Sequence, residues 1–224
     1  TMDEAVLISA GLVATPPPKG KRVGIVTGGG GLGVMAADEC IEQGLLVPEL
    51  NPETTSKLRQ MLPPWWVPGN PVDLVAGIGY ASPRQVITVL IESKNIDSLI
   101  FIGMGWVHGS ADIAKLSPLK DKIDMNKMME HQKAGDLRYC RKIRDMIYNY
   151  QFPIILVGTQ IRRAIDKKFG SLVELLQSEV MLYPSIEDAV RFLSAFTKYE
   201  LWKARVGANG IRPVGPQCPA PEGK

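Results

Sequence analysis

The sequence predicts an α/β protein: a flavodoxin-like, three-layer fold with a five-stranded parallel sheet. Short apolar runs alternate with longer segments that suit helices, which is typical of a parallel sheet covered on both faces. The clearest unit is Arg22–Gly44, where an apolar run is followed by four consecutive glycines and a helix-competent segment. Right-handed crossovers then favour the flavodoxin-like strand order.

Each predicted element rests on apolar runs and on capping residues. The β-branched residues of the first run suit a buried strand. Asn51, Ser82 and Ser185 are placed to cap helices, and proline follows the first two. The predicted strands are 23–26, 45–50, 98–103, 153–159 and 180–184. The predicted helices are 1–14, 33–44, 51–62, 82–95, 123–150, 171–178 and 185–205.

Proline and glycine divide the chain into three parts. Residues 1–21 are expected to form an N-terminal helix followed by a stiff, exposed proline linker, TPPPKGK. Residues 22–205 contain all the predicted strands and form the main domain. Residues 206–224 carry too many glycines and prolines for regular structure, so we expect a flexible tail or linker.

Composition excludes several classes of protein. The chain has 224 residues, is 45% hydrophobic and carries a net charge of +3 that is dispersed along its length. Nucleic-acid binding is not expected, and no apolar run approaches the roughly 18 residues that cross a bilayer. The three cysteines form no CxxC pair, so no metal site is expected and a cytoplasmic location is favoured.

The glycine run is the best candidate for a binding site. Glycines leave backbone N–H groups uncovered, and a helix N-terminus favours negative charge, so this turn suits a phosphate or a carboxylate. The candidate binding residues are Gly28, Gly29, Gly30, Gly31 and Gly33. A purely structural turn is one alternative. A dinucleotide site is another, because Gly28, Gly30 and Gly33 fit GxGxxG and Glu49 follows about 20 residues on.

Other unusual residues fall in loops that should meet the glycines. Ligands of such sheets bind beyond the carboxyl ends of the strands. Thr27 ends the first strand, and Asn70 and Asp73 could cap backbone groups or orient a neighbouring loop. His108 follows the strand 98–103, where an imidazole could meet an anion. No catalytic triad, HExxH or Walker sequence is present.

Three segments together resemble the ADP-forming (NDP-forming) acyl-CoA synthetases. They are KGKRVGIVTGGGGLGVMAADECIEQGL, LPPWWVPGNPVDL and VMLYPSIEDAVRFLSAFTKYELW. The matching part of that family is the succinyl-CoA-synthetase-like flavodoxin domain, which follows the phosphohistidine domain. The resemblance covers about residues 1–205.

The resemblance implies part of a ligase that converts an acid, CoA and ATP to acyl-CoA, ADP and phosphate. The glycine loop would bind the phosphoryl group of the phosphohistidine or acyl phosphate. Gly105, Trp106 and Val107 resemble the segment that helps to hold the acid. No catalytic residue is implied in this chain, because neither His108 nor His131 lies in the family's phosphohistidine motif.

The resemblance also implies partners. A CoA-binding/phosphohistidine domain and an ATP-grasp domain or subunit would complete the enzyme. CoA, ATP or ADP, and Mg would act there, with no cofactor bound by this chain alone. One departure is Gly28, which stands where the family usually has asparagine. Two other functions stay open: a non-catalytic interaction or ligand-sensing module that docks through Trp65, Trp66 and the Met-rich helix 123–150, and an NAD-type dinucleotide-binding domain.

Overall fold

A five-stranded parallel sheet forms the centre of the molecule. The computed structural model describes residues 2–75, 82–104, 125–158 and 180–208. The strand order is β2-β1-β3-β4-β5, which is the flavodoxin-like order and confirms the predicted fold class. The strands are β1 (Val23–Thr27), β2 (Val72–Asp73), β3 (Ser98–Ile102), β4 (Ile154–Val157) and β5 (Leu182–Tyr183).

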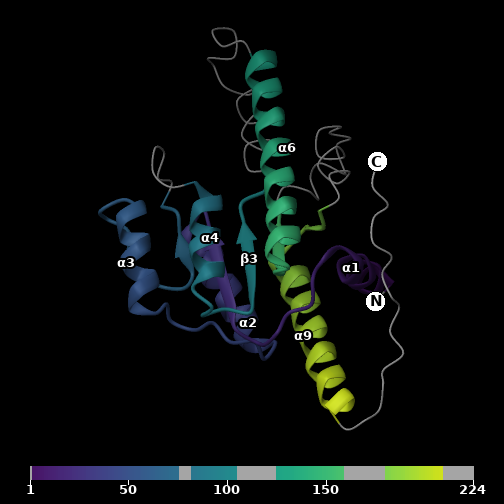
Figure 1. Cartoon of the computed structure of the whole chain (residues 1–224). Helices are drawn as coiled ribbons and strands as arrows, with labels where there is room; N and C mark the ends of the chain where they lie inside the picture. Colours follow the sequence, from purple (N-terminus) through teal and green to yellow (C-terminus); the bar gives the residue numbers. More distant parts are fainter. Residues whose placement is uncertain (1, 76–81, 105–124, 159–179, 209–224) are drawn as a thin grey trace.

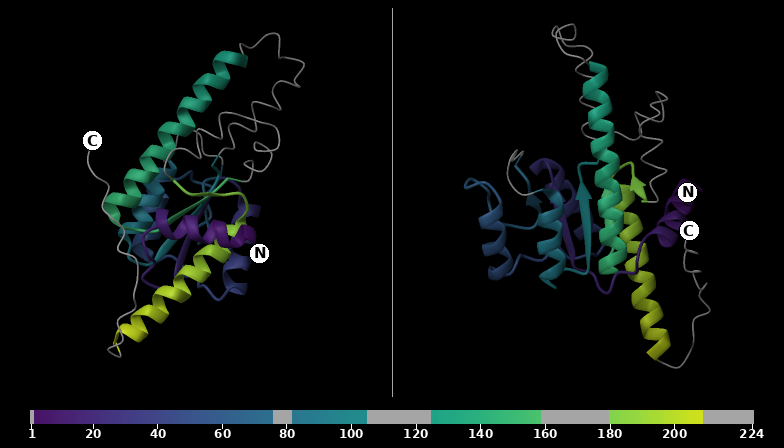
Figure 2. Two further views of the ribbon diagram at one scale, coloured as in Figure 1. Left: turned by 90° about the vertical axis from the view of Figure 1, so that its right-hand side faces the viewer. Right: turned by 45° about the horizontal axis from the view of Figure 1, so that its top comes forward.

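Helices cover both faces of the sheet (Figure 1). Helices α3, α4 and α6 pack on one face, and α2 and α9 pack on the other. Helix α1 lies beside α9, as Figure 2 shows, and also packs against Tyr183 of β5. The helices are α1 (Met2–Ala14), α2 (Gly30–Glu42), α3 (Pro52–Met61), α4 (Pro83–Glu92), α6 (Met125–Tyr150) and α9 (Ile186–Ala208).

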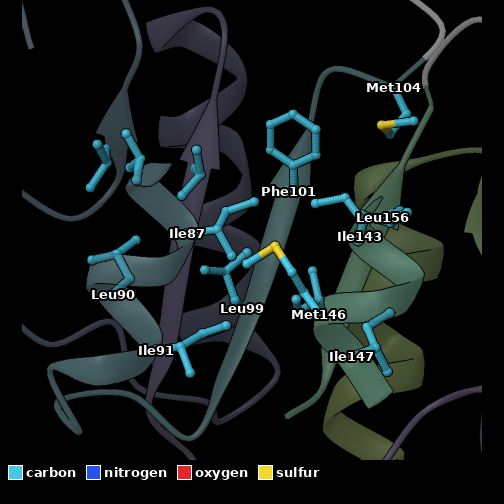
Figure 3. Close-up of a cluster of buried hydrophobic side chains, with 14 of the residues drawn as sticks. Ile87, Leu90, Ile91, Leu99, Phe101, Met104, Ile143, Met146, Ile147 and Leu156 are labelled. Carbon is cyan, nitrogen blue, oxygen red and sulfur yellow. The ribbon is translucent and has the colours of Figure 1, made fainter. Parts of the chain in front are cut away.

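Strand β3 shows why the central runs of the sequence are apolar without alternation. Leu99 and Phe101 enter the core beneath α4 and α6, which Figure 3 shows. Ile100 and Ile102 enter the second core, beneath α2 and α9. All of these side chains are at most 4% exposed, so the strand is covered on both faces.

The predicted second strand, 45–50, is wrong. Only Leu46 makes a bridge there, to Arg22, and the strand that pairs with β1 at the sheet edge is β2 instead. Pro48 has no N–H to donate to a sheet, which interrupts pairing in the middle of the predicted run. The position of β2 was assigned to a loop from the sequence.

The predicted helix caps are confirmed. The Asn51 Oδ1 accepts from the Thr54 N–H at 2.8 Å, and the Ser185 Oγ accepts from the Asp188 N–H at 3.1 Å. The backbone N–H of Ser82 donates to the Gln85 Oε1 at 2.9 Å in a capping box. Gly44, at φ +80°, ends α2 in a conformation that favours glycine.

The N-terminal helix packs against the domain. Gly11 lies against the Tyr183 hydroxyl and the Phe192 ring, where any side chain would clash. The segment after α1 is exposed at several positions, but Thr15 and Pro18 are buried, so the expected exposure of the proline linker is wrong for these two.

Some predictions fall on residues that lie outside the described part of the chain. They are the helix 171–178 and the tail from residue 209. Among the helices that are described, none combines the length and apolar character that a membrane-spanning segment needs.

A charged pair joins β1 and β3 at the amino edge of the sheet. The Arg22 guanidinium donates to both Asp97 carboxylate oxygens, with Nη2–Oδ1 at 2.7 Å and Nε–Oδ2 at 3.0 Å. The Arg22 backbone N–H also donates to Oδ2, at 3.0 Å. Burial raises the pKa of Asp97, but the hydrogen bonds and the charge of Arg22 outweigh burial and hold this pKa below its usual value.

We expect Asp97→Asn to lower the free energy of unfolding by about 1–2 kcal/mol near neutral pH, because a charge-assisted bidentate pair is lost. Since the folded pKa of Asp97 is lowered, its stabilisation is complete above the unfolded pKa of about 4 and is lost as the pH falls through the folded value. Urea unfolding of both proteins from about pH 6 to about pH 3 measures this. A difference that stays constant over this range would contradict the assignment.

Candidate functional site

The glycine loop lies at the carboxyl edge of the sheet. Strand β1 ends at Thr27, and α2 begins at Gly30 with Gly29 as its extended N-cap residue. The register places Thr27 beside both Asp73 of β2 and Ile102 of β3. The strand order reverses between β1 and β3, so the loop occupies the switch point at which open α/β sheets bind ligands.

Hydrogen bonds within the loop leave two N–H groups at its tip. The Gly29 N–H donates to the Thr27 Oγ1 at 3.1 Å, and the Gly28 N–H donates to the Ile102 carbonyl at 3.4 Å. The N–H groups of Leu32 and Gly33 both donate to the Gly29 carbonyl, at 3.2 and 3.4 Å. The N–H groups of Gly30 and Gly31 open the first turn of α2, where a helix offers no acceptor of its own.

The space around the glycines separates their roles. A Cβ on Gly33 would lie 3.0 Å from the Pro71 Cβ and 3.0 Å from the Thr27 Cγ2. Gly33 is therefore needed for close packing of α2 on the strands. A Cβ on Gly31 would meet no atom within 4 Å, so the surface of the loop is open at this residue.

Asp73 lies next to the first turn of α2. A Cβ on Gly30 would be 2.9 Å from the Asp73 Oδ2. The other oxygen, Oδ1, accepts from the Val75 N–H at 2.9 Å, in the manner of an Asx-type turn. The carboxylate thus orients the backbone after β2 and also faces the glycine loop. This second contact was missed from the sequence, because the position of β2 was not predicted.

Asn70 performs a structural task away from the loop. Its Oδ1 accepts from the Ile25 N–H at 2.9 Å, and its Nδ2 donates to the Val23 carbonyl at 2.9 Å and to the Pro48 carbonyl at 3.0 Å. The side chain therefore pairs with β1 much as a neighbouring strand would. This outcome fits the predicted capping of backbone groups and places Asn70 below the carboxyl edge.

We expect Asn70→Ala to lower the free energy of unfolding by about 3 kcal/mol, since three part-buried backbone groups lose their partner. Asn95→Ala is the matched control, because Asn95 Nδ2 makes an exposed bond to the Glu49 carbonyl. Urea unfolding of both variants measures the two effects. Equal losses in the two variants would contradict the role given to Asn70.

The remaining predicted site residues divide into two groups. Trp66 is buried in the core cluster that also contains residues of α3 and α4, whereas Trp65 is 63% exposed. A docking surface made by both tryptophans is therefore not formed, because only Trp65 is exposed. The other group lies outside the described residues and consists of Gly105, Trp106, Val107 and His108.

The position of Glu49 argues against a dinucleotide site. The Glu49 carbonyl accepts from the side chain of Asn95, a residue that precedes β3 at the amino edge of the sheet. A dinucleotide fingerprint requires its acidic residue near the carboxyl edge, close to the glycines. Glu49 is thus on the wrong side of the sheet for that chemistry.

The described residues offer neither a reactive thiol nor a cluster of metal ligands. Cys40 is fully buried, and burial, with a smaller contribution from the charge of Glu39, raises its pKa to about 12. No group of three or more His, Cys, Asp or Glu side chains that could hold a metal ion occurs in the part of the chain that the structure describes.

Comparisons with known proteins find sequence similarity to subunits of ADP-forming acetate–CoA ligases. Residues 23–114 match the family model for the Ligase-CoA domain. The chain is 39% identical over 102 residues to the alpha subunit of ADP-forming acetate–CoA ligase II of Pyrococcus furiosus, covering 46% of the chain and 22% of that subunit. It is 27% identical over 209 residues to the alpha subunit of ligase I of the same organism, covering 92% of the chain and 38% of that subunit.

Solved structures show the same fold. A crystal structure of a protein from Pyrococcus horikoshii has a TM-score of 0.56 and 23% identity, covering 94% of this chain and 41% of that protein. An acetyl-coenzyme A synthetase of Candidatus Korarchaeum cryptofilum, in complex with phosphate and ADP, has a TM-score of 0.56 and 16% identity, covering 95% of this chain and 40% of the synthetase chain. The chain spans less than half of these relatives.

Proposed function

Because the chain is related in sequence to ADP-forming acetate–CoA ligases and carries a Ligase-CoA domain match, we propose that it is a domain or subunit of an ADP-forming acyl-CoA synthetase. Its task is to bind a phosphoryl group at the glycine loop during transfer between the acyl phosphate and a phosphohistidine. The observation that carries this role is the pair of open N–H groups of Gly30 and Gly31 at the carboxyl edge of the sheet.

Electrostatics explains what such a loop contributes. The first N–H groups of α2 have no partner within the helix, and the aligned peptide dipoles add roughly half a positive charge at this end. The N–H groups of Gly30 and Gly31 are held in place by the Thr27–Gly29 hydrogen bonds and by the packing of Gly33. They therefore need no rearrangement when a negatively charged phosphoryl group binds. Donors that are preorganised in this way lower the barrier to a transfer that develops negative charge.

The rest of the reaction is assigned to other parts of the enzyme. The chain spans less than half of its relatives, and the phosphohistidine, CoA-binding and ATP-grasp domains are proposed as its partners. ATP or ADP, CoA and Mg would bind there, and this chain alone is expected to be inactive. Gly105, Trp106 and Val107 are proposed to contribute to the acid site.

Gly31→Leu tests the role of the loop. The new side chain has space at this position, so the fold is retained while the approach to the N–H groups is blocked. In the complete enzyme we expect phosphohistidine formation to slow by roughly 100-fold, the effect of losing an anion-stabilising donor. Rapid-quench measurement of the phosphorylated enzyme, started from ATP or from an acyl phosphate, detects this.

The control is Val34→Leu, which places the same leucine side chain at a nearby position of α2 that is 58% exposed. It should leave the rate unchanged, and both variants should unfold at a temperature close to that of the wild type. Normal phosphohistidine formation by a folded Gly31→Leu enzyme would refute the proposed role.

A further inference from the structure

The fold places a negatively charged side chain, that of Asp73, beside the glycine loop. Asp73 ends β2 directly beside Thr27, and its Oδ2 lies 2.9 Å from the position that a Cβ on Gly30 would occupy. A carboxylate oxygen therefore stands at the first turn of α2. This is the same turn whose open N–H groups are proposed to receive a phosphoryl group.

The position of this carboxylate is fixed from several sides. Asp73 pairs with β1, and the next residue continues this attachment, because the Leu74 N–H donates to the Thr27 carbonyl at 2.8 Å. The Val75 N–H binds Oδ1. Among the described residues, Oδ2 accepts no hydrogen bond and Asp73 takes part in no ion pair. Its charge is therefore not neutralised by a neighbouring cation there.

The consequence is competition between two anions. A phosphate that approaches the N–H groups of Gly30 and Gly31 comes within a few ångströms of the Asp73 carboxylate, and like charges repel at that distance. The carboxylate also already interacts with the positive end of α2. Both effects weaken the binding of an anion from solution.

We propose that Asp73 is a specificity-determining residue that keeps the affinity of the glycine loop for free inorganic phosphate low. The proposal rests on the proposed function of the loop. A loop that bound phosphate tightly would remain occupied by the product of the reaction and would exclude the next phosphoryl group. Asp73 prevents this because its carboxylate is a fixed negative charge beside the site and repels free phosphate.

A purely structural role for Asp73 makes a different prediction. A carboxylate near a helix N-terminus stabilises the helix, so removing its charge lowers stability whether or not the loop binds phosphate. Only competition predicts that the same change increases affinity for phosphate. The two roles are therefore separated by measuring stability and binding on one variant.

Asp73→Asn is the test, because asparagine retains an oxygen for the Val75 N–H and loses the charge. Inorganic phosphate is titrated into the full 224-residue chain by calorimetry at constant ionic strength. We expect the dissociation constant to fall about tenfold, as repulsion between nearby charges at a solvated surface is removed. Asp73→Ser, also uncharged and able to accept a hydrogen bond, serves if the asparagine variant does not fold.

Asp38→Asn is the matched control, since it removes one exposed carboxylate from the middle of α2 and should change phosphate affinity less than about twofold.

If the wild type binds phosphate and Asp73→Asn binds it equally well or more weakly, the inference is overturned. The proposed function would stand in that case if Gly31→Leu abolishes binding. If Asp73→Asn increases the affinity for phosphate even in a protein that also carries Gly31→Leu, the phosphate binds elsewhere, and the inference is overturned as well. No binding by either the wild type or Asp73→Asn would refute both the inference and the phosphate site.

Discussion

The parallel pairing of β1 with its two neighbours sets the position of every group in the candidate site. It brings the ends of β1, β2 and β3 to one level, with Thr27 between Asp73 and Ile102. The pairing on the β2 side is short, and Asn70 continues it with side-chain bonds to Val23 and Ile25. One amide side chain therefore helps to hold the strand from which the glycine loop begins.

The same register explains why neighbouring glycines have different tasks. Gly33 faces Pro71 and Thr27 at packing distance, so its missing side chain allows α2 to approach the sheet. Gly31 is two residues earlier and faces open space, so its missing side chain leaves the N–H groups accessible. A single run of glycines thus combines a packing requirement with a binding surface.

Much of the fold could be predicted because its signals are local. The apolar runs at β1, β3 and β4, the caps at Asn51 and Ser185, and the glycine at the end of α2 each depend on a few adjacent residues. The edge strand β2 could not be predicted in this way. It has two residues, and its place is fixed by contacts with β1 that are distant in sequence.

The candidate site was predictable to the same extent. The glycine loop can be recognised from its run of glycines. The contact between Asp73 and Gly30, by contrast, exists only because two strands have a particular register. The division of labour among the glycines likewise depends on what surrounds them in space. The roles of Asn70 and Glu49 depend on their positions relative to the edges of the sheet. Their spacing from the glycines in the sequence does not reveal these positions.

In the part of the chain that the structure describes, the strands at the two edges of the sheet are β2 and β5, and each has two residues. Long unpaired edges are templates on which other chains add strands, and short ones are a common protection against aggregation. Pro71, which precedes β2, has no N–H to offer and shortens that template further. Association by continuation of the sheet is therefore disfavoured for this domain. Any assembly that it joins is expected to form through its helices and loops, which leaves the strand register around Thr27 undisturbed.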